Sequence, residues 1–257
     1  MLTIDLNADI GESFGVYRLG DDEALLDVVT SANIACGFHA GDYRTMNKAV
    51  KSAVMKGVAI GAHPGYPDLF GFGRRPMAMP AEEIHELLVY QIGAMQGYCR
   101  ANGTLLHHVK PHGALYNTAA ADPLVAQAVA KAVKDVCPEA RLMGLAGSEL
   151  VKAGHEAGLQ VMAEAFADRQ YTAEGRLVSR GSPGAVLEAE DDVVTQVTGI
   201  VFRQQVEAID GRAVPIQADT LCFHGDGKEA AVLAKVVRTK LEQAGVRCQS
   251  PASAGDE

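Results

Sequence analysis

Residues 32–42 read ANIACGFHAGD, a short apolar run that ends in glycines around Phe38 and His39 and stops at Asp42. A run of this length followed by glycines is typical of a buried strand that leaves its sheet through a tight loop. Glycine lets the backbone turn with positive φ or lie close to a ligand. The stretch therefore predicts a strand that ends in a titratable ring, with Phe38 pointing outward under a helix.

The same pattern recurs along most of the chain. Short apolar runs predict strands at 2–6, 32–36, 57–62, 104–109, 141–145, 160–165 and 219–223. Apolar stripes with i, i+3, i+4 spacing predict helices at 122–136, 191–209 and 228–244. Residues 176–180 and 214–217 indicate an extra hairpin or strand, and the sequence does not give its position in the fold. About seven alternating units favour a parallel sheet with helices outside, either closed as a barrel or open and doubly wound.

The polar residues decide between these two folds. An open sheet gathers ligand contacts at one switch point, whereas a barrel draws them from the C-terminal ends of most strands. Nearly every predicted strand here runs into ionisable or amide side chains: Asn7 and Asp9; His39 and Asp42; His63; Lys110 and His112; Glu164, Asp168 and Arg169; His224 and Asp226. The sequence thus predicts a parallel (β/α) barrel with a polar mouth.

Alternation along the strands sharpens this prediction, because residues two apart share a face. Asp5, Asn7 and Asp9 share one face of the first strand. Asp42 precedes a helical pattern and is interpreted as a helix cap. His39 is interpreted as facing the mouth; the alternative is a buried histidine tied to a backbone carbonyl. The glycine-rich stretch 61–75 predicts a long ordered lid.

Composition limits the function further. The chain has 257 residues, a net charge of −9 and no concentration of Lys and Arg, which argues against nucleic acid as a partner. The first residues carry no signal-peptide pattern and no stretch approaches 18 apolar residues, so we expect a cytosolic protein without a membrane span. We expect one barrel domain over 1–245 and a flexible tail over 246–257.

The sequence contains no motif that identifies a cofactor. Neither GxxxxGK[ST] nor GxGxxG occurs, which argues against a P-loop or a dinucleotide site. The five cysteines are widely spaced, and this spacing predicts that they are reduced thiols. Two of them, Cys36 and Cys222, lie near strand ends, and a nucleophilic role for them stays open. Several residues are suitable ligands for zinc or manganese, but no compact motif fixes a site: His39, His63, His112, His224, Asp9, Glu164 and Asp226.

Seven stretches together resemble the LamB/YcsF family over about residues 1–245. They are DLNADIGESFG (5–15), SANIACGFHAGD (31–42), GAHPGYPDLFGFGRR (61–75), VKPHGALYN (109–117), EAFADRQY (164–171), LVSRG (177–181) and DTLCFHGD (219–226). The resemblance implies a distorted barrel of the glycoside hydrolase/deacetylase-like type. It also implies that the chain works together with the B and C subunits of 5-oxoprolinase in the ATP-dependent hydrolysis of 5-oxo-L-proline to L-glutamate.

Roles on these positions follow from physical chemistry. The expected catalytic residues are Asp9, His39, Lys110 and Glu164. The expected substrate-binding residues are Asn7, His63, His112, Asp168, Arg169, Arg180, His224 and Asp226. A carboxylate or imidazole would act as general base, and the cations would hold a carboxylate or phosphate. ATP is expected as co-substrate, and a divalent metal and self-association stay open. The alternatives are a metal-dependent amide hydrolase or deacetylase that needs no ATP, and a non-catalytic substrate-binding subunit.

Overall fold

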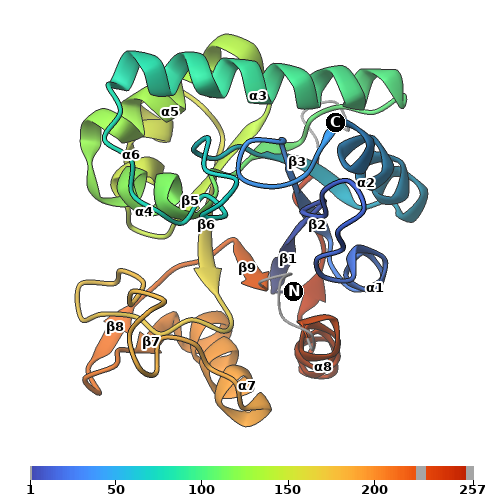
Figure 1. The fold of residues 1–257 in the computed structure, drawn as a ribbon. Coiled ribbons are helices and arrows are strands. Elements are labelled where there is room, and N and C mark those ends of the chain that lie inside the picture. The colour runs from blue at the N-terminus through green and yellow to red at the C-terminus, as the bar shows by residue number, and fades with distance from the viewer. Residues whose placement is uncertain (1, 224–229, 253–257) are drawn as a thin grey trace.

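The computed structural model describes residues 2–223 and 230–252. In that part of the chain, parallel strands close into a barrel (Figure 1). The strands are β1 (Thr3–Ile10), β2 (Ser31–Ala35), β3 (Ala59–His63), β4 (His108–Val109), β5 (Arg141–Leu145), β6 (Val161–Phe166) and β9 (Thr220–Phe223). Closure follows because β1 pairs with both β2 and β9. The predicted parallel barrel is confirmed, and every predicted strand is found.

Helices follow the strands and cover the outside of the barrel. They are α1 (Asp22–Leu26), α2 (Tyr43–Lys56), α3 (Ala81–Ala101), α4 (Gly113–Ala121), α5 (Pro123–Val136), α6 (Glu149–Glu156), α7 (Glu190–Thr198) and α8 (Ala230–Gln243). Asp42 caps α2, since its side chain accepts from the Arg44 and Thr45 amides. The helix predicted over 191–209 is shorter than expected: α7 continues as the π-helix η1 (Gly199–Arg203) and stops at Gln204, whose φ is 52°.

In the described part of the chain, three further strands lie outside the barrel. The hairpin of β7 (Gln205–Glu207) and β8 (Ala213–Pro215) accounts for the extra strand expected at 214–217, whereas residues 176–180 are not its partner. The strand β10 (Arg247–Cys248) pairs in parallel with the start of β1. Beyond it, His107 and Arg141 contact the carbonyl oxygens of Pro251 and Ala252. Residues 246–252, which the sequence assigns to a tail, thus lie against the barrel.

The apolar cores lie between strands and helices, not on the barrel axis. One core joins β1–β5 to α2, α3, α5 and α6, and the other joins β1, β6, β9 and β10 to α7 and α8. The axis itself is polar. Asp5 accepts hydrogen bonds from Thr30, Ser31 and Thr220, and its pKa is raised chiefly by burial. This filling differs from the branched apolar layers of most barrels, and it extends upward into the polar mouth.

Two glycines of the opening stretch allow a test of how tightly the strand ends are packed. Gly41 has φ +76°, and a Cβ added there would lie 2.6 Å from the Gly11 carbonyl oxygen. Gly37 has φ +86°, but a Cβ there would have nothing within 4 Å. We expect Gly37→Ala to cost about 1–2 kcal/mol through backbone strain alone. Gly41→Ala should cost about 1–3 kcal/mol more, because backbone must also move.

Urea unfolding of the two variants measures this difference. Gly37→Ala is the matched control, since both positions share the left-handed conformation. Equal losses of stability would contradict the close packing of the two strand-end loops.

Candidate active site

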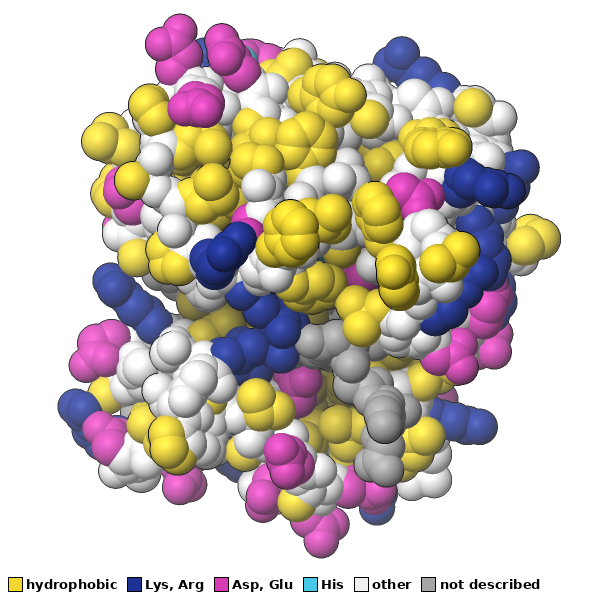
Figure 2. All heavy atoms as spheres, in the orientation of Figure 1, with side chains coloured by type: hydrophobic (Ala, Val, Ile, Leu, Met, Phe, Trp, Pro, Cys, Tyr) yellow, Lys and Arg dark blue, Asp and Glu magenta, His cyan; other side chains and the backbone are white. Residues whose placement is uncertain are grey.

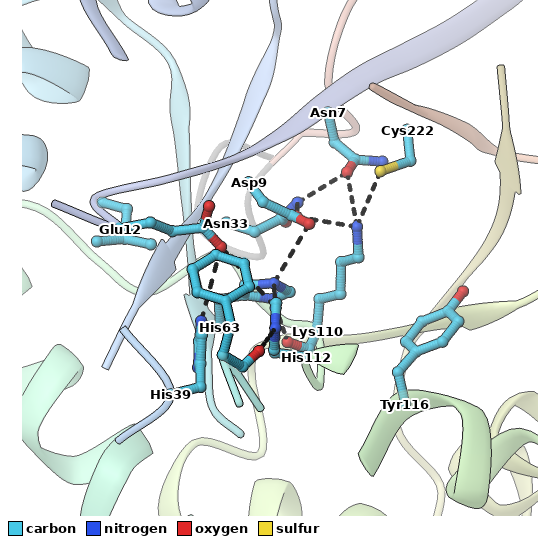
Figure 3. A network of polar contacts seen from close by, with 12 residues as sticks. Asn7, Asp9, Glu12, Asn33, His39, His63, Lys110, His112, Tyr116 and Cys222 are labelled. Atoms are coloured by element: carbon cyan, nitrogen blue, oxygen red, sulfur yellow. Dashed lines mark hydrogen bonds and ion pairs between the residues drawn. The ribbon is translucent and has the colours of Figure 1, made fainter. Parts of the chain in front are cut away.

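Lys110 lies at the centre of a buried ionic network at the mouth of the barrel (Figure 3). Its Nζ is 3.1 Å from Asp9 Oδ1, 2.8 Å from Glu164 Oε1 and 3.1 Å from Cys222 Sγ. Burial alone would lower the pKa of Lys110, but the negative charges, that of Asp9 foremost, outweigh it and hold the pKa well above its usual range. The ammonium therefore stays charged between two carboxylates.

Amide and phenol groups complete this network. Asn7 donates to Glu164 Oε1 at 3.0 Å, and Asn33 donates to Asp9 Oδ1 at 2.8 Å. Tyr116 donates to Glu164 Oε2 at 2.7 Å, and burial raises the pKa of this phenol, so it remains a donor. Both oxygens of Glu164 are thus engaged and the residue is fully buried. Asp9 lines the cavity, whereas Glu164 is not among the described residues of the lining.

A second group, here called the histidine cluster, consists of Glu12, His39, His63 and His112. The four side chains come from loops after β1 and β2, from the end of β3 and from the start of α4, and all are buried. His63 Nε2 lies 2.9 Å from His112 Nδ1, and His39 stacks on His112 with ring centroids 3.7 Å apart. Figure 3 shows this group beside the lysine network, with Asp9 between them.

Backbone carbonyls fix two of the imidazoles. His63 Nδ1–H donates to the Lys110 carbonyl at 2.8 Å, and His112 Nε2–H donates to the Phe72 carbonyl at 2.8 Å. Phe72 has φ +54°, and this unusual conformation belongs to the loop over the cluster. That loop is the lid expected from 61–75. Its Gly65 and Gly73 lie so close to His39 that an added Cβ would fall within 2.8 and 2.7 Å of the side chain.

His39 matches neither interpretation drawn from the sequence. It is fully buried and does not line the cavity, and within residues 2–223 and 230–252 neither ring nitrogen has a hydrogen-bond partner. Its Nε2 lies 3.7 Å from Glu12 Oε1. Burial, with His112 and His63 nearby, lowers the pKa of His39 well below its usual value. Phe38 packs edge-on against Tyr90 of α3, as expected.

A cavity of about 660 Å³ opens above Asp9, Lys110, His63 and His112. Cationic side chains line its wall: Arg74, Arg169, Arg176 and Arg180. Figure 2 shows Lys and Arg side chains gathered around a hollow near the centre of this face. Arg169 donates to the Ala185 and Val178 carbonyls, which orders the loop after β6. A cationic wall on a chain of net charge −9 favours a small anionic ligand.

The cysteines are unsuited to nucleophilic attack. All five are free and buried, which confirms the expectation of reduced thiols. Burial raises the pKa of Cys36 to about 12 and that of Cys222 well above its usual value. The reactive thiolate is therefore suppressed at neutral pH.

The structure brings together most of the residues expected at the site. Asn7, Asp9, Lys110 and Glu164 form the lysine network, His39, His63 and His112 the histidine cluster, and Arg169 and Arg180 line the cavity. Asp168 is half-buried and does not belong to the cavity lining in the described part of the chain. His224 and Asp226 lie outside the described residues.

Sequence reasoning missed several members of the site. Glu12 lies in the loop after β1 and Tyr116 lies on α4, and neither was singled out from the sequence. Asn33 carried a usable signal, because it is the one amide inside the otherwise apolar ANIA run of β2. Arg74 and Arg176 are loop residues that only the folded chain brings to the cavity wall.

Among residues 2–223 and 230–252, no helix combines the length and apolar character needed to cross a bilayer.

Comparisons with known proteins agree with this architecture. A curated relative from Tolumonas auensis, the A subunit of a 5-oxoprolinase, is 52% identical over 250 residues, covering 97% of this chain and all of the relative. The crystal structure of a lactam utilization protein from Thermus thermophilus has a TM-score of 0.91 and 44% identity, over 97% of this chain and all of that one. A polysaccharide deacetylase from Bacillus cereus, at 10% identity and a TM-score of 0.50 over 99% of this chain and 94% of its own, shares the fold alone.

The family model for LamB/YcsF matches residues 4–255. The resemblance noted from the seven sequence stretches is thereby confirmed, and the chain belongs to the LamB/YcsF family.

Proposed function

We propose that this protein is the A component of an ATP-dependent 5-oxoprolinase. It would act in the cytoplasm with partner B and C subunits and convert 5-oxo-L-proline, ATP and water into L-glutamate, ADP and phosphate. The observation that carries the proposal is the cavity, which joins a wall of arginines to a floor with Asp9 and Lys110. The names of the relatives supply the substrate class, since one belongs to a 5-oxoprolinase and another is a lactam utilization protein.

The charges of the cavity suit such a substrate. 5-Oxoproline is a small anion with a carboxylate beside a five-membered lactam. Arg176 and Arg180 are placed on the wall where a guanidinium can hold the carboxylate, or a phosphate, through two hydrogen bonds. Apolar side chains of Leu145 and Phe166 complete the lining for the ring. The lactam carbonyl would then lie towards Asp9 and Lys110.

Asp9 is the best-placed general base. It borders the cavity. Its Oδ1 accepts from Asn33 and Lys110, and its Oδ2 lies 3.4 Å from His63 Nε2. A carboxylate in this position can take a proton from water as the water attacks the lactam carbon. Lys110 carries a permanent positive charge beside the reacting carbonyl and would stabilise negative charge as it develops there. Glu164, Asn7 and Tyr116 would act by holding Lys110 in place.

Lactam hydrolysis requires activation because an amide is a weak electrophile. We infer that the carbonyl oxygen attacks the γ-phosphorus of ATP, releasing ADP and giving a phosphorylated lactam. Water then adds to the ring carbon and the C–N bond breaks, its electron pair and a proton going to nitrogen. A second water hydrolyses the resulting acyl phosphate to glutamate and phosphate. Because the sequence has no P-loop, we assign the phosphorylation to the assembly with the B and C subunits.

Co-expression with candidate B and C subunits tests the proposal. The three-subunit preparation should release glutamate from 5-oxoproline only with ATP, with about one ADP formed per glutamate, and omission of this chain should abolish release. Turnover by this chain alone without ATP would overturn the proposal in favour of an ATP-independent amide hydrolase. Substrate binding with full activity of three-subunit preparations in which Asp9, Lys110 and Glu164 are replaced would instead indicate a non-catalytic binding subunit.

A further inference from the structure

We propose that the histidine cluster is a binding site for one divalent transition-metal ion. The ligands would be one carboxylate oxygen of Glu12 and one ring nitrogen each of His39, His63 and His112. These four atoms lie within 4.8 Å of one another, and every one belongs to a buried side chain. The inference goes beyond the proposed function and does not depend on it.

The hydrogen bonds of two imidazole rings leave two unprotonated ring nitrogens that a cation would bind. A backbone carbonyl only accepts, so His63 carries its proton on Nδ1 and His112 carries its proton on Nε2. The other nitrogens, His63 Nε2 and His112 Nδ1, then face each other at 2.9 Å with a lone pair on each. Two lone pairs at this distance repel each other unless a positive charge lies beside both.

The outward hydrogen bonds themselves are those expected of metal ligands. A ligating histidine usually donates its second N–H to a carbonyl or carboxylate, which fixes the ring and raises its basicity. Both His63 and His112 meet this condition through the Lys110 and Phe72 carbonyls. Phe72, which supplies one of these carbonyls, has a positive φ.

The spacing fits a metal centre. With metal–nitrogen bonds of about 2.0–2.1 Å, neighbouring ligand atoms lie about 2.9 Å apart at right angles and about 3.4 Å apart in a tetrahedron. The pair His63 Nε2 and His112 Nδ1 is at 2.9 Å. Glu12 Oε1 lies 3.7 Å from His39 Nε2 and 3.9 Å from His112 Nδ1. Both distances exceed the tetrahedral value, so the Glu12 and His39 side chains would move inward to complete one coordination shell.

His39 supplies an independent observation. It is 0% exposed, and neither of its ring nitrogens has a hydrogen-bond partner among the described residues. A buried polar group without a partner is costly and calls for a specific reason. Coordination of a metal through Nε2, on the side of Glu12, provides that reason.

The ligand set indicates the kind of metal. Three imidazoles and one carboxylate suit zinc and its neighbours in the first transition row, whereas magnesium and calcium prefer oxygen ligands. His63 and His112 also line the cavity, so the ion would lie at its wall beside Asp9. A cation there would supply Lewis-acid character at the edge of the site.

Metal binding by the purified full chain tests this inference without any activity measurement. After removal of metal by a chelator, titration with Zn²⁺ followed by dialysis and elemental analysis should give one ion per chain. Co²⁺ should give the visible absorption of a nitrogen-and-oxygen site. His39→Gln should weaken binding about 100-fold or more, since even loss of an outer hydrogen bond to a ligand costs 10- to 100-fold.

Controls keep the outcome clear. His39→Gln removes no hydrogen bond of the described chain, so we expect it to fold; circular dichroism checks this, and Glu12→Gln is the second variant. His155→Gln, on the exposed side of α6, is the matched control and should bind Zn²⁺ as the unmodified chain does. A folded chain that retains no ion, or folded ligand variants with unchanged affinity, would overturn the inference. If the folded chain retained no ion, a proton shared between His63 Nε2 and His112 Nδ1 would account for their separation of 2.9 Å.

Discussion

Replacing Asp9 with asparagine is expected to lower kcat of the assembled enzyme by about 10²–10⁴-fold, the usual contribution of a general base. The substitution keeps the shape of the side chain. Its Oδ1 can still accept from Asn33 and Lys110, as in the unmodified chain. An amide, however, cannot take a proton from water. We therefore expect KM for 5-oxoproline to change much less than kcat, as measured by glutamate release at saturating ATP.

The matched control is Asp42→Asn. Asp42 caps α2 by accepting from the Arg44 and Thr45 amides, and asparagine caps helices about as well as aspartate. Asp42 does not line the cavity in the described part of the chain, so activity should remain. If both variants turned over normally, Asp9 would have no role as a base, and the catalytic proton would have to pass through another group.

Replacing Lys110 with methionine is expected to abolish activity and to lower the free energy of unfolding by about 3–5 kcal/mol. This is the usual effect of removing one partner from a buried ion pair, because the remaining charge loses its compensation. Here two carboxylates, those of Asp9 and Glu164, would remain buried beside an apolar side chain. Urea unfolding gives the change in stability, provided that the transition stays two-state.

Two further variants test whether the loss of stability comes from uncompensated buried charge. Adding Glu164→Gln to Lys110→Met removes one of the uncompensated charges, so the double variant should be more stable than Lys110→Met alone. Lys131→Met breaks an ion pair with Asp135 at the exposed surface and should cost less than about 1 kcal/mol. If Lys110→Met lowered the free energy of unfolding no more than Lys131→Met does, the Lys110 ammonium would compensate no buried charge.

The fold could be predicted because its signals are local. Short apolar runs marked the barrel strands, apolar stripes marked three of the helices, and polar residues at successive strand ends distinguished a closed barrel from an open sheet. One local prediction was wrong. The apolar stripe predicted a helix over 191–209, but the helix ends before Gln204, where the chain turns with a positive φ. Nothing in the apolar spacing records a backbone dihedral angle, so the end of that helix could not be read from it.

The sequence indicated that several of these residues would lie close together, but not all of them and not how they are arranged. Strand-end position correctly indicated that Asp9, Lys110 and His63 would meet, because parallel strands present their C-terminal ends together. It could not separate the lysine network from the histidine cluster, since that division depends on distances between side chains. It also could not find Glu12, which reaches the cluster from a loop. His39 also lies close against Gly65 and Gly73, which are far along the chain.

The polar axis of the barrel bears on how the chain is made. Thr220 donates to Asp5 and accepts from Asn7, so the last barrel strand completes bonds that begin in the first. Until β9 has left the ribosome, Asp5 and Asn7 lack their hydrogen bonds to Thr220, although Asn7 can already donate to Glu164 of β6. We therefore expect the ring of strands to close only after β9 has been synthesised, when β1 and β6 gain the strand that pairs with both.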